Sequence, residues 1–95
     1  MNWRMAINKN MEIKLEIPDY DKTKGFQYHW EDGFEITVVN NGNSIAILAN
    51  KEGLISLAVQ MLTLAQETVP LNKYINLDEY GGLEDGSNEL IIQKI

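Results

Sequence analysis

The chain has 95 residues, no cysteine and a formal net charge of −6, from eight basic and fourteen acidic residues. The length indicates one domain, the lack of cysteine excludes disulfides and thiolate metal sites, and the negative charge argues against nucleic acid or an anionic membrane as the partner. No apolar run approaches the roughly 18 residues that span a membrane, so the cytoplasm is the expected location.

The first part of the chain alternates in the way that is typical of strands. Residues 1–10 have two interpretations, as an extension of the domain or as an edge strand. Apolar and charged residues alternate strictly over 11–17 (MEIKLEI), which predicts a half-buried strand. An alternating aromatic run predicts a second strand over 26–30 (FQYHW), and a three-residue connection ending in glycine leads to a third over 34–39.

The centre of the chain contains the strongest local signals. Asn41-Gly42 predicts a type I′ hairpin turn into a strand over 43–48. A helix is then predicted over about 50–67, with Asn50 as its N-cap and Pro70 shortly beyond its end. Its apolar residues recur at spacings of three and four, which predicts one wide buried stripe: Leu54, Leu57, Ala58, Met61, Leu62, Leu64 and Ala65.

Two further strands, over 73–77 and 89–94, complete the expected α+β domain, which spans residues 1–95. The predicted fold is a single, mostly antiparallel sheet of five or six strands in the order β-β-β-β-α-β-β, with the one helix packed on one face. The alternation places mostly polar and acidic side chains on the open face: Glu12, Glu16, Gln27, His29, Glu31, Glu35 and Thr37.

No group of residues in the sequence indicates catalysis, a metal or a cofactor. His29 is the single histidine, and a lone histidine without a matched carboxylate pair is usually a surface residue. The aromatic side chains of 26–30 are interpreted as part of the core or its rim. The segment 77–89 carries five acids and no base, and the loop predicted within it, over 78–88, has two interpretations. One is an ordinary solvated loop, and the other is an anionic patch that meets a basic protein.

Two segments resemble a family of small bacterial immunity proteins, which are encoded beside polymorphic and contact-dependent toxins. They are ANKEGLISLAVQMLTLAQETVP (49–70) and LDEYGGLEDGSNELIIQK (77–94), and the similarity extends to MEIKLEIPDYD and FQYHWEDGFEI. The resemblance implies a binding protein without catalytic activity that neutralises a cognate toxin. The polar positions that match the family's motifs are Asp78, Glu79, Glu84, Asp85 and Ser87.

We expect these five residues to contact the toxin, as an acidic plug over a basic site. The alternative is an interaction module unrelated to toxins, or a homodimeric accessory protein that uses the same open sheet. A small enzyme is the least favoured class, because the sequence contains no nucleophile–base pair and no set of metal ligands.

Overall fold

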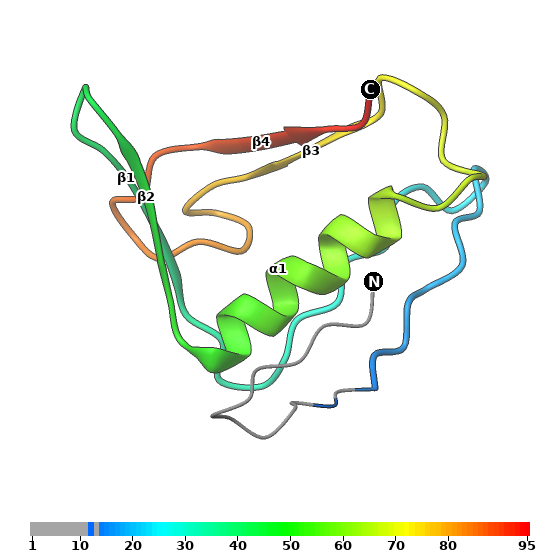
Figure 1. Ribbon diagram of the computed structural model, residues 1–95, viewed down its shortest axis with the longest axis horizontal. Coiled ribbons are helices and arrows are strands. Elements are labelled where there is room, and N and C mark those ends of the chain that lie inside the picture. The colour runs from blue at the N-terminus through cyan, green and yellow to red at the C-terminus, as the bar shows by residue number, and fades with distance from the viewer. Residues whose placement is uncertain (1–11, 13) are drawn as a thin grey trace, which may run out of the picture.

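The computed structural model describes residues 12 and 14–95. Its elements follow the order β1 (Ile36–Asn40), β2 (Ile45–Ala49), α1 (Lys51–Leu64), β3 (Tyr74–Leu77) and β4 (Leu90–Gln93) (Figure 1). The interpretation of residues 1–10 as an edge strand lies outside the described residues. Residues 12 and 14–17 belong to no strand, so the strand predicted over 11–17 is wrong where the structure describes it.

The described strands form two separate sheets, so the predicted single sheet of five or six strands is wrong. β1 pairs with β2, and β3 pairs with β4, each pair being antiparallel. In Figure 1 the two hairpins and α1 lie along three sides of a triangle, and α1 does not cross the face of one broad sheet. The polar face expected on that sheet therefore does not exist as a continuous surface.

The β1–β2 hairpin turns one residue later than the sequence predicts. The N–H of Asn41 donates to the carbonyl oxygen of Ser44 at 3.2 Å, which leaves Gly42 and Asn43 as the central residues. Only Gly42 of these two has a positive φ, of 91°, as in a type II′ turn and not the predicted type I′ turn. The side-chain oxygen of Asn41 accepts from the N–H groups of Asn43 and Ser44, which stabilises the shifted turn.

The helix begins where the sequence predicts and ends three residues earlier. Asn50 is the N-cap, and its side-chain oxygen accepts from the N–H of Gly53 at 2.7 Å. Gly53 lies so close to β1 that a Cβ atom there would collide with the carbonyl oxygen of Glu35. The helix therefore requires this glycine for close packing, although glycine lowers helix propensity.

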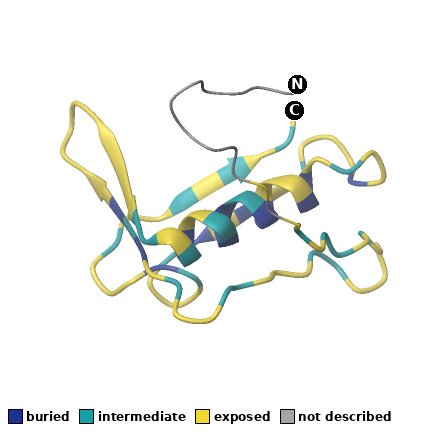
Figure 2. Cartoon of the chain, turned by 60° about the horizontal axis from the view of Figure 1, so that its bottom comes forward, coloured by how far each residue is buried: buried dark blue, intermediate teal, exposed yellow. Residues whose placement is uncertain are grey.

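The buried side of α1 is partly polar, contrary to the predicted apolar stripe. Ser56, Gln60 and Thr63 are at most 1% exposed, whereas Leu54 and Met61 are 56% and 45% exposed. Figure 2 shows the buried residues along one side of the helix and at the base of the β1–β2 hairpin. The helix is thus rotated so that part of its apolar stripe faces outward.

The polar side of α1 is buried because it holds the segment that the sequence predicts as a strand over 26–30. Gln60 accepts from the N–H of His29 at 2.9 Å and donates to its carbonyl oxygen at 2.6 Å. Ser56 accepts from the N–H of Glu31 at 2.8 Å. Helix side chains therefore satisfy backbone groups that a neighbouring strand would satisfy in a sheet, so residues 26–30 form no strand.

The main hydrophobic core lies where the two hairpins meet α1. Its buried members come from β1, α1, β3 and the loop after β3, and they are Ile36, Val38, Leu57, Leu77 and Leu83. Trp30 and Phe34 pack against this cluster, with ring centroids 4.7 Å apart in a stacked arrangement. The aromatic run thus contributes to the rim of the core, as the sequence predicts.

Candidate partner-binding surface

The loop that connects β3 to β4 (residues 78–89, here the acidic loop) folds back on itself at its start. The N–H of Gly81 donates to the carbonyl oxygen of Asp78 at 3.0 Å, and the N–H of Leu83 donates to the same oxygen at 3.0 Å. The carboxylate of Asp78 accepts from the N–H of Tyr80 at 3.0 Å. Asp78 therefore fixes the shape of the loop, and Tyr80 is left 91% exposed.

The second half of the acidic loop is bound along the outer edge of β1. The N–H of Glu84 donates to the carbonyl oxygen of Ile36 at 2.8 Å, and the N–H of Asn88 donates to that of Val38 at 2.9 Å. The hydroxyl oxygen of Ser87 accepts from the N–H of Val38 at 3.2 Å. The loop is thus an ordered part of the fold that occupies an edge where a third strand would otherwise pair.

The five residues predicted as partner contacts therefore divide into two groups. Asp78 and Ser87 have their side chains engaged in the fold, and Glu79 accepts from the N–H of Gly86 at 2.9 Å. Glu84 and Asp85 are exposed, and no hydrogen bond or ion pair from the described part of the chain reaches either carboxylate. Of the four carboxylates among the five residues, only those of Glu84 and Asp85 accept no hydrogen bond from the described residues, and they are the free carboxylates of the loop.

A shallow pocket lies beside the acidic loop. It has a volume of about 160 Å³ and is lined by Tyr28, Trp30, Asn76, Leu77 and Gly81. The rings of Tyr28 and Trp30 are stacked at 5.8 Å, and the partial burial of Tyr28 raises the pKa of its phenol. A Cβ atom on Gly82 would come within 2.6 Å of the Trp30 ring, so this glycine allows the loop to lie against the aromatic rings.

The described residues contain no cluster of three or more side chains that could hold a metal ion. His29 is exposed, and its Nε2 lies 2.9 Å from a carboxylate oxygen of Glu31, as a surface pair. No helix within residues 12 and 14–95 has the length and apolar character to cross a membrane.

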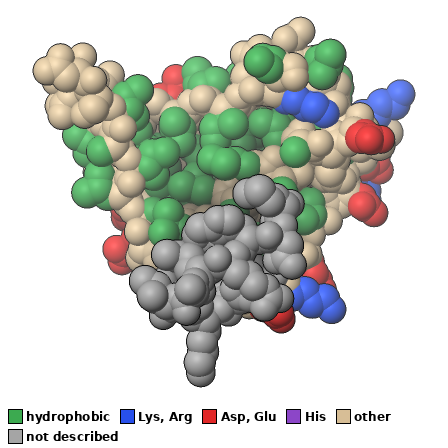
Figure 3. Space-filling view, in the orientation of Figure 1, with side chains coloured by type: hydrophobic (Ala, Val, Ile, Leu, Met, Phe, Trp, Pro, Cys, Tyr) green, Lys and Arg blue, Asp and Glu red, His purple; other side chains and the backbone are tan. Residues whose placement is uncertain are grey.

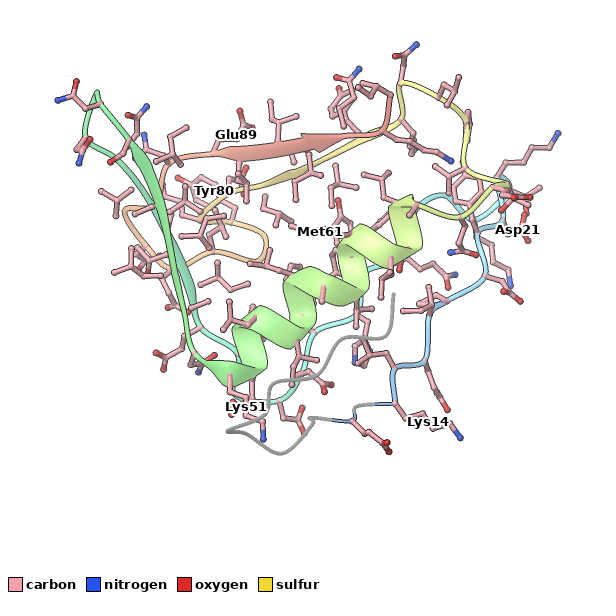
Figure 4. All side chains as sticks on the ribbon, in the orientation of Figure 1. Lys14, Asp21, Lys51, Met61, Tyr80 and Glu89 are labelled. Atoms are coloured by element: carbon pink, nitrogen blue, oxygen red, sulfur yellow. The ribbon has the colours of Figure 1, made fainter. Side chains whose placement is uncertain are left out.

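A broad apolar surface over β2, α1 and β4 is a second feature of the molecule, and the sequence does not predict it. Figure 3 shows apolar side chains gathered between the β1–β2 hairpin, α1 and the β3–β4 hairpin. The exposed apolar residues of β2 and α1 are Ile45, Ile47, Leu48, Leu54, Met61 and Leu62. Met61 also lines a groove of about 150 Å³ with Ile92 of β4, and Figure 4 shows it projecting from α1 toward β3–β4. The signal in the sequence is an apolar strand, IAILA, followed by the apolar helix stripe, and the prediction that this stripe is buried hides the surface.

Comparison with known protein families shows which family the chain belongs to. The family model described as Immunity protein 32 matches residues 44–95, which are 52 of the 95 residues. The chain belongs to the Immunity protein 32 family.

The predicted resemblance to bacterial immunity proteins is therefore confirmed. Searches of curated proteins and of solved structures give no match. The matched region begins just before β2 and contains α1, the acidic loop and both strands of the second hairpin. Both the acidic loop and most of the exposed apolar surface thus belong to the part of the chain that the family shares.

Proposed function

We propose that this chain protects the cell that makes it by binding a cognate toxin, and that it acts by occupying a surface of the toxin and not by catalysis. Membership of the Immunity protein 32 family carries this proposal. Two features of the described residues are in keeping with a binding role: an ordered loop with free carboxylates, and a broad exposed apolar surface. Surfaces of this kind commonly mark contacts between proteins.

In this proposal the acidic loop supplies the electrostatic part of the contact. Glu84 and Asp85 meet cationic groups on the toxin, while Asp78, Glu79 and Ser87 act indirectly by fixing the shape of the loop. The order of the loop matters, because a loop that is already fixed loses little conformational entropy when it binds. Its charge, which is part of the net −6 of the chain, favours rapid association with a basic surface.

The test compares two charge-neutralising double variants. E84Q/D85N removes the two free carboxylates of the acidic loop. The matched control D19N/E67Q removes two exposed carboxylates near the C-terminal end of α1. Both variants change the net charge from −6 to −4, so a difference between them reports the position of the charge and not its total.

Association with the product of the adjacent toxin gene is measured by stopped-flow mixing at several salt concentrations. We expect E84Q/D85N to slow association by roughly threefold or more at low salt and to flatten its salt dependence, because steering depends on the local field. We expect D19N/E67Q to change the rate less. Equal rates for the two variants would refute the role of the loop, and absence of any complex with the wild-type chain would refute the function itself.

A further inference from the structure

The outer edge of β2 carries backbone groups that no other described residue pairs with, and the hydrogen bonds at the two ends of the hairpin show which groups these are. Asn41 bonds to Ser44, and the N–H of Asn50 donates to the carbonyl oxygen of Glu35, both at 3.2 Å. Bonded and non-bonded pairs alternate along an antiparallel ladder. The register of the hairpin therefore directs the N–H and carbonyl groups of Ile45 and Ile47 away from β1.

The two edges of this hairpin differ. On β1 the acidic loop meets four of the six outward groups, which are the carbonyl oxygens of Ile36 and Val38 and the N–H groups of Val38 and Asn40. On β2 no hydrogen bond from residues 12 and 14–95 meets the outward groups of Ile45 or Ile47. Among the residues that the structure describes, the acidic loop thus covers the edge of β1, and none covers the edge of β2 at Ile45 and Ile47.

The side chains of β2 include none of the usual features that prevent another strand from pairing with an exposed edge. Proteins commonly protect exposed strand edges with lysine, proline, a bulge or a covering loop. β2 is IAILA, without a charge or a proline, and its side chains Ile45, Ile47 and Leu48 are 65%, 41% and 56% exposed. Ile45 and Ile47 share one face of the strand and Leu48 lies on the other, so both faces of the edge are apolar.

We propose that β2 is a docking edge for an extended strand of the toxin, which adds to the hairpin as its third strand. The inference rests on the proposed function and specifies how the partner is held. The outward N–H and carbonyl groups of Ile45 and Ile47 are complementary to an added strand, and the two apolar faces of β2 favour a strand with apolar side chains on both sides. Backbone pairing supplies the docking geometry, and the exposed apolar surface of α1 beside β2 extends the contact (Figure 3).

Charge favours a basic partner over a second copy of this chain. The free carboxylates of Glu84 and Asp85 belong to the loop bound along the opposite edge of the same hairpin. A second copy would bring another net charge of −6 toward this end of the molecule, whereas a cationic toxin would be attracted.

The first measurement is amide hydrogen exchange in the wild-type protein, followed residue by residue by NMR. In the free protein we expect the amides of Ile45 and Ile47 to exchange fast, and those of Ala46 and Leu48, which face β1, to exchange slowly. On addition of the adjacent gene's toxin domain, in an inactive form, the exchange of Ile45 and Ile47 slows by about tenfold or more.

The second measurement compares I45K with L71K. Ile45 and Leu71 are almost equally exposed, at 65% and 67%, but Leu71 lies outside β2. A lysine at the edge opposes the addition of a strand, so we expect I45K to weaken toxin binding by about tenfold or more and L71K to leave it nearly unchanged. Circular dichroism of both variants confirms that they remain folded.

The outcomes separate this inference from the proposed function. Wild-type binding with unchanged exchange at Ile45 and Ile47, and with I45K binding as tightly as L71K, would overturn the docking edge and leave the immunity function standing. Protection of the same amides that grows with protein concentration without toxin would identify a second copy as the occupant and would also overturn it. Failure of the wild-type chain to bind the toxin would instead refute the proposed function.

Discussion

The side chain of Gln60 is the main tie between α1 and the extended segment before β1, and its replacement gives a sharp prediction. The residue is fully buried and makes three hydrogen bonds: two with the backbone of His29, at 2.9 and 2.6 Å, and one to the carbonyl oxygen of Ser56, at 2.8 Å. In Q60L all three are lost. The side chain keeps a similar length, so the change removes polarity more than volume.

The expected cost follows from these contacts. Three hydrogen bonds contribute about 3 kcal/mol in total, and the added apolar burial of leucine offsets about 1 kcal/mol. The backbone groups of His29 lie near the surface, so water satisfies part of what is lost. We therefore expect Q60L to lower the free energy of unfolding by about 2 kcal/mol, out of roughly 5–14 kcal/mol for a chain of this length.

The assay is urea denaturation followed by circular dichroism, with Q27L as the matched control. Gln27 lies in the same extended segment, is exposed and makes no side-chain hydrogen bond with the described residues, so the same substitution there should cost less than about 0.5 kcal/mol. Equal stabilities for Q60L and Q27L would show that the helix does not hold this segment through Gln60, and would refute the explanation given for the missing strand.

Three further predictions concern local features. Asn50→Ala removes a side-chain oxygen that accepts from two backbone N–H groups and an amide that donates to a third residue. We therefore expect urea denaturation to show a free energy of unfolding that is lower by about 2 kcal/mol. A decrease of less than about 0.5 kcal/mol would contradict the role of Asn50 as the helix cap. Gly82→Ala forces a Cβ atom against the Trp30 ring at a φ of 96°, and a drop in melting temperature of about 5 °C or more is expected, whereas an unchanged value would contradict the packing. Burial raises the pKa of Tyr28 above its ordinary value of 10.0, so the contribution of its neutral phenol to stability is full below pH 10 and is lost as the pH rises through the pKa of the folded state. Absorbance titration of the wild-type protein should show one tyrosine that ionises late, and this late ionisation should be missing from Tyr28→Phe. The same late ionisation in both proteins would show that the raised pKa does not belong to Tyr28.

Local signals in the sequence predicted most individual elements correctly. The start of α1 follows from Asn50 and the apolar spacing after it, and the four described strands lie within two residues of their predicted starts. Asn41-Gly42 correctly indicated a hairpin, although the side chain of Asn41 shifts its turn by one residue. These signals depend on residues that are close in the chain, so they are visible without the structure.

The arrangement of the elements could not be predicted in the same way, because it depends on contacts between distant residues. Alternation over 26–30 is typical of a strand, but the partner that satisfies this backbone is Gln60 and not another strand. Ser87 and its neighbours close the edge of β1, which separates the two hairpins. The prediction of a broad sheet failed for these two reasons.

The sequence indicates the composition of the candidate partner-binding surface but not the arrangement of its side chains. Its acidic composition is visible in the sequence, but the division between structural residues, such as Asp78, and free carboxylates, such as Glu84, requires the structure. The apolar surface was missed because an apolar stripe on a lone helix is normally buried, and Leu54 and Met61 are both substantially exposed.

The most direct test of the proposed immunity function is growth of cells that express the adjacent toxin gene under an inducible promoter, with and without this chain. We predict that the toxin alone stops growth and that co-expression of the wild-type chain restores it in proportion to the amount expressed. A toxin that remains equally harmful beside a well-expressed, folded chain, or an adjacent product that is harmless alone, would contradict the account.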